Sequence, residues 1–68
     1  MMQYEITVWW SEEDATFVAE IPELPGCSAH GPTEAEAIAN VKDAAALWID
    51  VAKAAGDPVP LPRRRATA

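Results

Sequence analysis

The seventeen residues from Ile21 to Ala37, IPELPGCSAHGPTEAEA, constrain the fold of this chain more than any other segment. Pro22 and Pro25 hold φ at about −65° and lack the backbone N–H that a sheet ladder needs, so a strand must end near Ile21. Thr33 followed by Glu36 is typical of a capping box, which predicts that a helix begins near residue 34. The residues in between must therefore form a shaped connection from a strand to a helix.

Two glycines within this connection have a predicted backbone role. Gly26 directly follows Pro25, and Gly31 lies just before Pro32. Both are expected to supply conformational freedom at turns, where a Cβ would clash if φ were positive.

Alternating hydrophobicity before the connection predicts a β-hairpin. Residues 3–10 are expected to form one strand and residues 15–21 the return strand, joined by the polar turn Ser11-Glu12-Glu13-Asp14. The predicted apolar face consists of Tyr4, Ile6, Val8 and Trp10 on the first strand and Phe17, Ala19 and Ile21 on the second. One apolar and one mixed face are typical of a sheet that is covered on one side only. Residues 27–30 are long enough for a short third strand.

A single long helix is predicted for residues 34–55, with Gly56 as its C-terminal stop and Pro58 preventing continuation. Apolar residues at helical spacing should face the sheet. They are Ile38, Val41, Ala45, Trp48 and Ala52, widened by Ala37, Ala44, Leu47, Val51 and Ala55. Residues 57–62 are interpreted as a brief edge strand. The predicted fold class is therefore α+β, a two-layer β-β-β-α-β domain with one helix packed on a small sheet over residues 1–62 and a basic flexible tail over 63–68.

Chain length and cysteine content indicate which oligomeric state and which cellular compartment to expect. A chain of 68 residues has a small core, so association with a copy of itself or with a partner is expected, with a homodimer favoured. No apolar run approaches the roughly 18 residues of a membrane span, and the N-terminus does not resemble a signal peptide. The single cysteine, Cys27, excludes an internal disulfide and fits a reducing compartment, so the cytoplasm is expected.

Charge is distributed unevenly along the chain. Residues 1–62 hold eleven acidic residues against two lysines, a net charge of −9, whereas RRRATA at the end carries +3. An acidic body repels phosphate backbones, so a basic protein is expected as partner rather than a nucleic acid. The alternative is that the acidity serves only solubility. Arg63-Arg64-Arg65 is interpreted as a solvated tail because no aromatic residues are interleaved with it; the alternative is contact with RNA, DNA or an acidic neighbour.

The connection resembles a motif of the HicB antitoxin family and of the UPF0150-like solo domains similar to it. In that motif a strand ends before Pro-x-Leu-Pro-Gly-Cys, and a Gly and a Thr precede Glu-Ala at a helix start. It is matched by Ile21, Pro22, Leu24, Pro25, Gly26, Cys27, Gly31, Thr33, Glu36 and Ala37. The resemblance covers Tyr4 to about Pro62 and implies the same order of elements. These residues have turn and capping roles, so they identify a scaffold rather than a reactive site.

Trp9 and Trp10 are adjacent, so on a strand their side chains point to opposite faces. Trp10 is predicted to join the core on the helix side. Trp9 is predicted to lie on the open face beside Val18 and to anchor a partner, because tryptophan is enriched at interface centres. The alternatives are an incidental surface aromatic residue or a bulge that turns both rings inward.

Acidic residues are the second predicted part of a partner-binding surface. Glu12, Glu13 and Asp14 form a cluster at the hairpin tip, with Glu5, Glu20 and Glu23 expected nearby to steer a basic partner. The alternative is an ordinary solvated turn. One cysteine and one histidine, Cys27 and His30, are too few for a structural zinc site, so neither a metal nor another cofactor is expected.

The resemblance implies an antitoxin-like binding protein that neutralises a basic HicA-type mRNA-cleaving toxin by covering its active surface. Longer members of the family carry a DNA-binding domain after the first. The six residues that follow Pro62 do not accommodate one, so transcriptional repression is not expected. An orphan self-associating module without a toxin remains the alternative. An enzyme is the weakest hypothesis, because no carboxylate cluster can be placed on adjacent strands to hold a catalytic metal.

Overall fold

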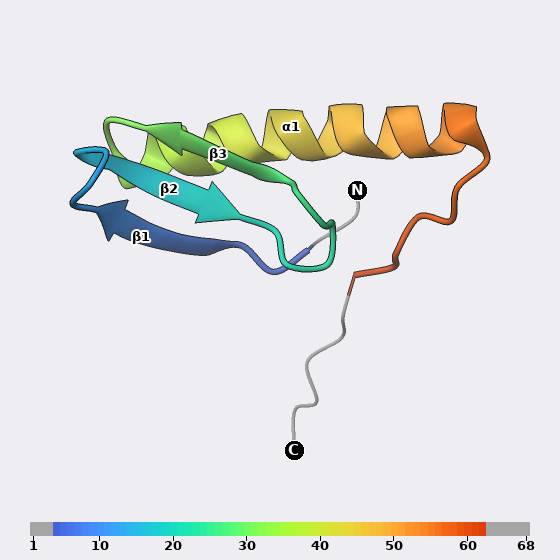
Figure 1. Ribbon diagram of the computed structural model, residues 1–68, viewed down its shortest axis with the longest axis horizontal. Helices are drawn as coiled ribbons and strands as arrows, with labels where there is room; N and C mark the ends of the chain where they lie inside the picture. Colours follow the sequence, from blue (N-terminus) through green and yellow to red (C-terminus); the bar gives the residue numbers. More distant parts are fainter. Residues whose placement is uncertain (1–3, 63–68) are drawn as a thin grey trace, which may run out of the picture.

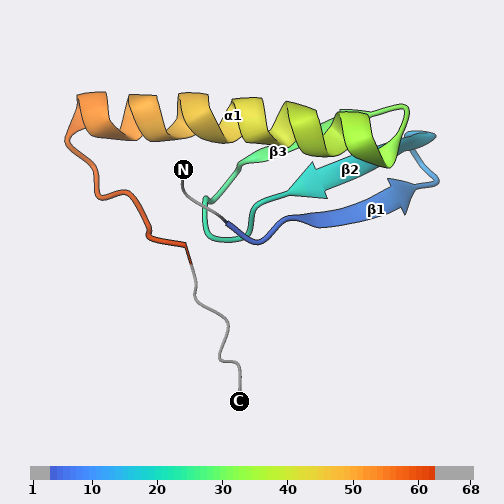
Figure 2. The ribbon, with the colours of Figure 1, turned by 180° about the vertical axis from the view of Figure 1, so that it is seen from behind.

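The computed structural model describes residues 4–62, which form a three-stranded sheet followed by one helix (Figure 1). The strands are β1 (Thr7–Ser11), β2 (Thr16–Glu20) and β3 (Ser28–Gly31), and the helix is α1 (Glu34–Ala55). The sheet is antiparallel in the order β1-β2-β3, and α1 lies along one face, closest to β3 and β2 (Figures 1 and 2). The predicted α+β two-layer class is confirmed. The predicted tail over 63–68 lies outside the described residues.

The strand register assigns side chains to the two faces of the sheet. Val8 lies opposite Ala19, and Trp9 lies opposite Val18. Because side chains alternate along a strand, Val8 and Ala19 face the helix, whereas Trp9 and Val18 face the other way. Within residues 4–62 no helix or strand covers that second face. The sheet is therefore covered on one side only, as its alternation predicted.

The proline corner consists of two consecutive turns. The Leu24 amide donates to the Ile21 carbonyl at 3.0 Å, and the Cys27 amide donates to the Leu24 carbonyl at 2.9 Å. Pro25 and Gly26 are the central residues of the second turn, and Gly26 has φ of 81°. Proline followed by glycine with positive φ is the signature of a type II turn. The Ile21 amide then closes the corner by donating to the Cys27 carbonyl at 3.1 Å.

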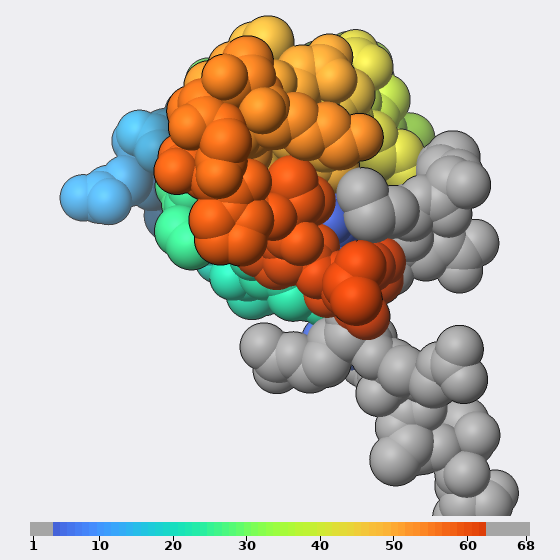
Figure 3. All heavy atoms as spheres, turned by 90° about the vertical axis from the view of Figure 1, so that its right-hand side faces the viewer, coloured from blue at the N-terminus to red at the C-terminus, as the bar shows by residue number. Residues whose placement is uncertain are grey.

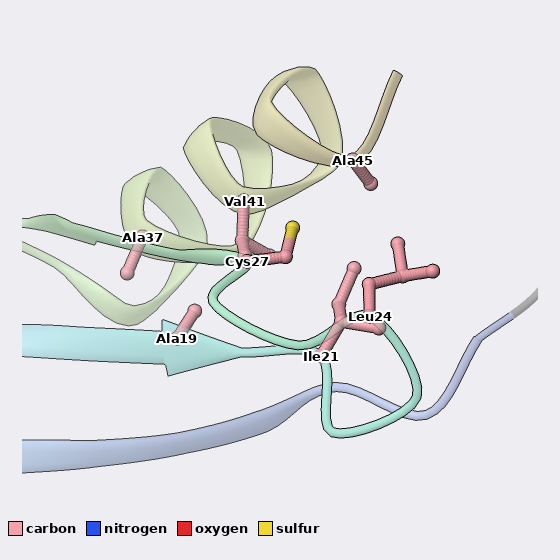
Figure 4. Close-up of a cluster of buried hydrophobic side chains, with 7 residues drawn as sticks. All are labelled: Ala19, Ile21, Leu24, Cys27, Ala37, Val41 and Ala45. Atoms are coloured by element: carbon pink, nitrogen blue, oxygen red, sulfur yellow. The ribbon is translucent and has the colours of Figure 1, made fainter. Parts of the chain in front are cut away.

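The corner also supplies the centre of the core. Its apolar residues meet the small residues of α1 and β2 (Figure 4), and the buried cluster comprises Ala19, Ile21, Leu24, Cys27, Ala37, Val41 and Ala45. Leu24 and Val41 are the largest fully buried side chains. Cys27 is a free, buried cysteine. The corner residues Ile21, Leu24 and Cys27 thus fill the core in addition to turning the chain.

Local signals at both ends set the limits of α1. At the N-terminus the Thr33 hydroxyl accepts from the Glu36 amide at 3.1 Å, which is one half of the predicted capping box. At the C-terminus Gly56 adopts φ of 77°, and the Asp57 amide donates to the Ala52 carbonyl at 2.8 Å. These are the features of a Schellman cap. Within residues 4–62, no helix has the length and hydrophobicity needed to cross a bilayer.

Gly31 differs from its predicted role. Its φ is not positive, since only Gly26 and Gly56 have positive φ among the glycines. Instead, β3 ends so close to the start of α1 that a Cβ on Gly31 would lie 2.8 Å from the Ala37 nitrogen. The absence of a side chain is needed for this close approach and not for a turn.

The predicted edge strand at residues 57–62 does not form. This segment has no strand pairing and runs from the end of α1 past the proline corner (Figure 3). Pro58, Pro60 and Pro62 each lack the N–H that a ladder requires. The segment is held by a side chain instead, because the Tyr4 hydroxyl donates to the Pro60 carbonyl.

Candidate partner-binding surface

Trp9 is the largest apolar side chain on the open face of the sheet. It is 42% exposed and lies directly across the β1–β2 pair from Val18. Glu20, two residues further along β2, is on the same face and is exposed. The structure therefore brings together an indole, an aliphatic side chain and a carboxylate. Trp9 beside Val18 was predicted, whereas Glu20 was expected near the hairpin tip and instead lies at the far end of β2. Such a surface can bind by burying apolar area while a charge orients the partner.

Trp10 was predicted to be a core residue, and this prediction is wrong. It is on the helix side of β1 and packs edge-on against Phe17, with ring centroids 5.0 Å apart, but 46% of it remains exposed. The reason is that α1 lies over β3 and β2 more than over β1, which is an edge strand. The Trp10 indole N–H donates to a Glu12 carboxylate oxygen at 3.1 Å. Both tryptophans therefore present apolar surface at the same edge of the sheet.

The β1–β2 hairpin carries its acidic residues on an ordered loop. Ser11 pairs with Thr16, and the Ser11 hydroxyl both donates to the Asp14 carboxylate and accepts from the Asp14 amide, each at 3.3 Å. Glu12 is held by Trp10, and Glu13 is exposed at the tip. The loop projects from the body of the molecule (light blue in Figure 3). The three carboxylates therefore form an accessible negative tip.

Glu23 does not belong to this tip. It is in the proline corner, at the opposite end of β2 from the hairpin (Figure 1). It is half-buried, and its charge raises the pKa of Tyr4 in addition to the larger effect of burial on that hydroxyl. The acidic residues proposed for partner binding are therefore divided between the two ends of the sheet. Only Glu12, Glu13 and Asp14 form one cluster.

Cys27 and His30, the two residues considered for a metal site or a nucleophile, lie in environments that favour neither role. Burial raises the pKa of the Cys27 thiol, which disfavours the reactive thiolate. His30 is exposed on β3, and the Asn40 amide donates to its backbone carbonyl at 2.8 Å. Among the described residues, no three His, Cys, Asp or Glu side chains are grouped so that they could hold a metal ion.

A second exposed apolar surface was missed. Leu47 and Val51 were expected to face the sheet, but they are 65% and 58% exposed. A three-stranded sheet is too narrow to cover a helix stripe that includes positions 37, 38, 44, 47, 48 and 51. The width of the stripe was therefore a signal that part of it would remain uncovered.

Comparison with known proteins identifies the family. Residues 4–67 match the family model described as HicB-like antitoxin of bacterial toxin–antitoxin systems. The chain is also 34% identical over 59 residues to UPF0150 protein Ta0767 of Thermoplasma acidophilum, an alignment that covers 87% of this chain and 84% of the relative. No solved structure gives a significant match. The exposed acidic and aromatic surface described above is therefore carried by a chain that belongs to the HicB-like antitoxin family.

Proposed function

We propose that this protein neutralises a basic HicA-type toxin that cleaves mRNA, by covering the active surface of that toxin. The observation that carries the proposal is the half-exposed Trp9, which lies beside Val18 and Glu20 on an uncovered sheet face. The role is binding without catalysis. Because the proposed partner acts on mRNA, the same proposal places the protein in the cytoplasm.

Charge supports the choice of a basic partner. A surface that binds RNA must attract phosphates and is therefore positive. Residues 1–62 of this chain carry a net charge of −9, and the hairpin presents three carboxylates at an accessible tip. These carboxylates can occupy the positive surface that RNA would otherwise reach. The expected consequence is competition between this protein and RNA.

The direct test is to mix the protein with a short basic toxin encoded beside it and to follow RNA cleavage. Cleavage should stop at equimolar antitoxin. Trp9→Ser should weaken inhibition by about thirtyfold or more, because the loss of a hot-spot residue costs about 2 kcal/mol or more. Leu61→Ser is the matched control, because Leu61 is also an exposed apolar residue, at 79%, but lies far along the chain from the sheet.

Two outcomes would contradict the proposal. Undiminished RNA cleavage at excess antitoxin would reject toxin neutralisation. Equal inhibition by wild type and Trp9→Ser would reject the open face as the binding surface. Association rates should also fall steeply as ionic strength rises, since charge attraction accelerates the encounter.

A second candidate function is self-association as a homodimer without a toxin. It is favoured by the position of Trp9 and Trp10 on β1, an edge strand whose outer side pairs with no other strand among residues 4–62. Pairing of two β1 edges would bury both tryptophans at one interface. The solution mass should then be that of a dimer, and Trp10→Ser should convert it to a monomer. A wild-type monomer at high micromolar concentration would exclude this candidate.

A further inference from the structure

A groove lies between the C-terminal half of α1 and the segment that leads into β3. Its volume is about 470 Å³, and it is lined by Ser28 on one side and by Leu47, Trp48 and Val51 on the other, with Asp57 at one end. It is on the helix side of the molecule, whereas Trp9 is on the open face of the sheet. The groove is therefore separate from the surface proposed to bind a toxin.

One lining side chain of the groove is held in place by a hydrogen bond within the protein. The Trp48 indole N–H donates to the Pro25 carbonyl at 2.9 Å, which joins α1 to the proline corner. Leu47 and Val51 are i and i+4 neighbours at the rim, and both are mostly exposed. Two adjacent aliphatic side chains beside a preformed hollow offer anchors for an apolar ligand surface.

Carboxylates lie at one end of the groove and beside one of its lining residues, Leu47. Asp43 and Asp50 are i−4 and i+3 from Leu47, so they flank it on the helix surface. Asp57 adds a third carboxylate at the end of the groove. Lys53 is i+3 from Asp50 and so neighbours that carboxylate, but it is six residues from Leu47, roughly 120° around the helix, and does not neighbour Leu47. An occupant should therefore combine apolar anchors with positive flanks.

We propose that this groove binds an amphipathic, positively charged helix of a partner protein. A second copy of this chain is disfavoured as occupant, because a two-fold contact brings the same surface onto itself and would oppose Asp57 and the two carboxylates beside Leu47 with their equivalents. An added β-strand is also disfavoured, because the Asn40 side chain occupies the His30 carbonyl at the edge of β3. A helix binds a groove through apolar side chains spaced at i, i+3 and i+4, and Leu47 and Val51 can contact such side chains.

The test uses two synthetic helical peptides and the full chain. One peptide carries leucines at i and i+4 flanked by lysines, and the other has glutamate in place of every lysine. Titration followed by NMR should give saturable shifts at Leu47 and Val51 with the lysine peptide only. The double variant Leu47→Ser/Val51→Ser should weaken binding by about tenfold or more. Both residues are exposed, so this variant should keep the wild-type fold, which circular dichroism checks.

Comparing Asp43→Asn/Asp50→Asn with Leu47→Ser/Val51→Ser separates the contribution of charge to peptide binding from that of apolar contact. Asp43→Asn/Asp50→Asn should weaken binding severalfold at low salt and flatten its dependence on ionic strength. Trp9→Ser should leave binding of the lysine peptide unchanged. A result that rejects the groove can therefore be told apart from one that rejects toxin binding at Trp9. Equal binding of both peptides, or shifts confined to the Trp9 face, would overturn the inference. So would a wild-type dimer that Leu47→Ser/Val51→Ser converts to a monomer, since a second copy would then fill the groove.

Discussion

Gly31 provides the sharpest test of how the two layers of this protein are joined. A Cβ on Gly31 would lie 2.8 Å from the Ala37 nitrogen and 3.0 Å from the Glu36 carbonyl carbon, both backbone atoms. Neither the start of α1 nor the end of β3 can move freely, because each is held by a hydrogen bond. The Ala37 amide donates to the Thr33 carbonyl at 3.0 Å, and the Gly31 carbonyl accepts from the Thr16 hydroxyl at 2.8 Å. Gly31→Ala must therefore disturb either the first turn of α1 or the end of β3.

The size of the effect follows from two opposing contributions. Overpacking against fixed neighbours costs about 1–3 kcal/mol. Replacing glycine by alanine restricts the unfolded chain and returns about 0.4–1 kcal/mol. The net loss in free energy of unfolding for Gly31→Ala should be about 1–2 kcal/mol. For a core this small, which supplies about 3–5 kcal/mol in total, that is a large fraction.

Gly26 is the matched control, because glycine is needed there for its backbone conformation and not for a close contact. Nothing lies within 4 Å of a Cβ built on Gly26, but its φ is 81°. Asparagine tolerates positive φ better than alanine, so Gly26→Asn should be less destabilising than Gly26→Ala. At Gly31 the order should reverse, because the larger asparagine side chain increases the clash.

Urea unfolding of the four variants at one fixed protein concentration measures both orders. The steric account of Gly31 fails if Gly31→Ala stays within about 0.5 kcal/mol of wild type, the usual range of neutral surface changes. It also fails if Gly31→Asn is no worse than Gly31→Ala.

Three further measurements address the core and its edges. Leu24→Ala should lower the free energy of unfolding by about 2–5 kcal/mol because Leu24 is fully buried, which is most of the stability of so small a core; a urea midpoint near that of wild type would contradict this. The pKa of Tyr4 is raised above 10.0 in the folded chain, so stability should fall as pH rises above 10, and Tyr4→Phe should reduce that fall. Alkylation of Cys27 by iodoacetamide should be slow until urea unfolds the chain, since burial raises the thiol pKa; equal rates with and without urea would argue against this burial.

Local signals account for the parts of the fold that the sequence predicted well. The helix limits depend on Thr33 and Gly56, and the corner depends on Pro25 and Gly26; each acts on backbone atoms only a few residues away. Strand alternation likewise placed Trp9 on the open face. These features need no knowledge of distant parts of the chain, so a single sequence is sufficient to predict them.

The features that were mispredicted depend on distant parts of the chain. Exposure of Trp10 and Leu47 depends on where a long helix crosses a narrow sheet, which the pattern of one element does not contain. Tyr4 and Pro60 are 56 residues apart, and their hydrogen bond replaces the expected last strand. Glu23 was grouped with the hairpin acids although the length of β2 separates them. Predicting the site fully would therefore have required the relative placement of the layers.

The hairpin loop that carries the acidic tip contains one strained residue. Ala15 has φ of 53°, the only positive value at a non-glycine residue in the described part of the chain. An L-residue in this region costs roughly 1–2 kcal/mol because its Cβ approaches the following carbonyl. Asparagine and glycine tolerate the conformation, whereas a β-branched residue tolerates it least. Stability should therefore rise by about 0.5–1 kcal/mol in Ala15→Gly or Ala15→Asn and fall in Ala15→Val.

Relief of this strain should leave the binding residues in place, because Glu12 and Asp14 are held by Trp10 and Ser11 rather than by Ala15. Ala15→Asn should therefore inhibit a toxin at least as well as wild type while unfolding at higher urea. The decisive observation is the order of unfolding midpoints across the three Ala15 variants. If Ala15→Val is as stable as Ala15→Asn, the left-handed conformation at this position is absent in solution, and the loop does not hold its carboxylates in the geometry described above.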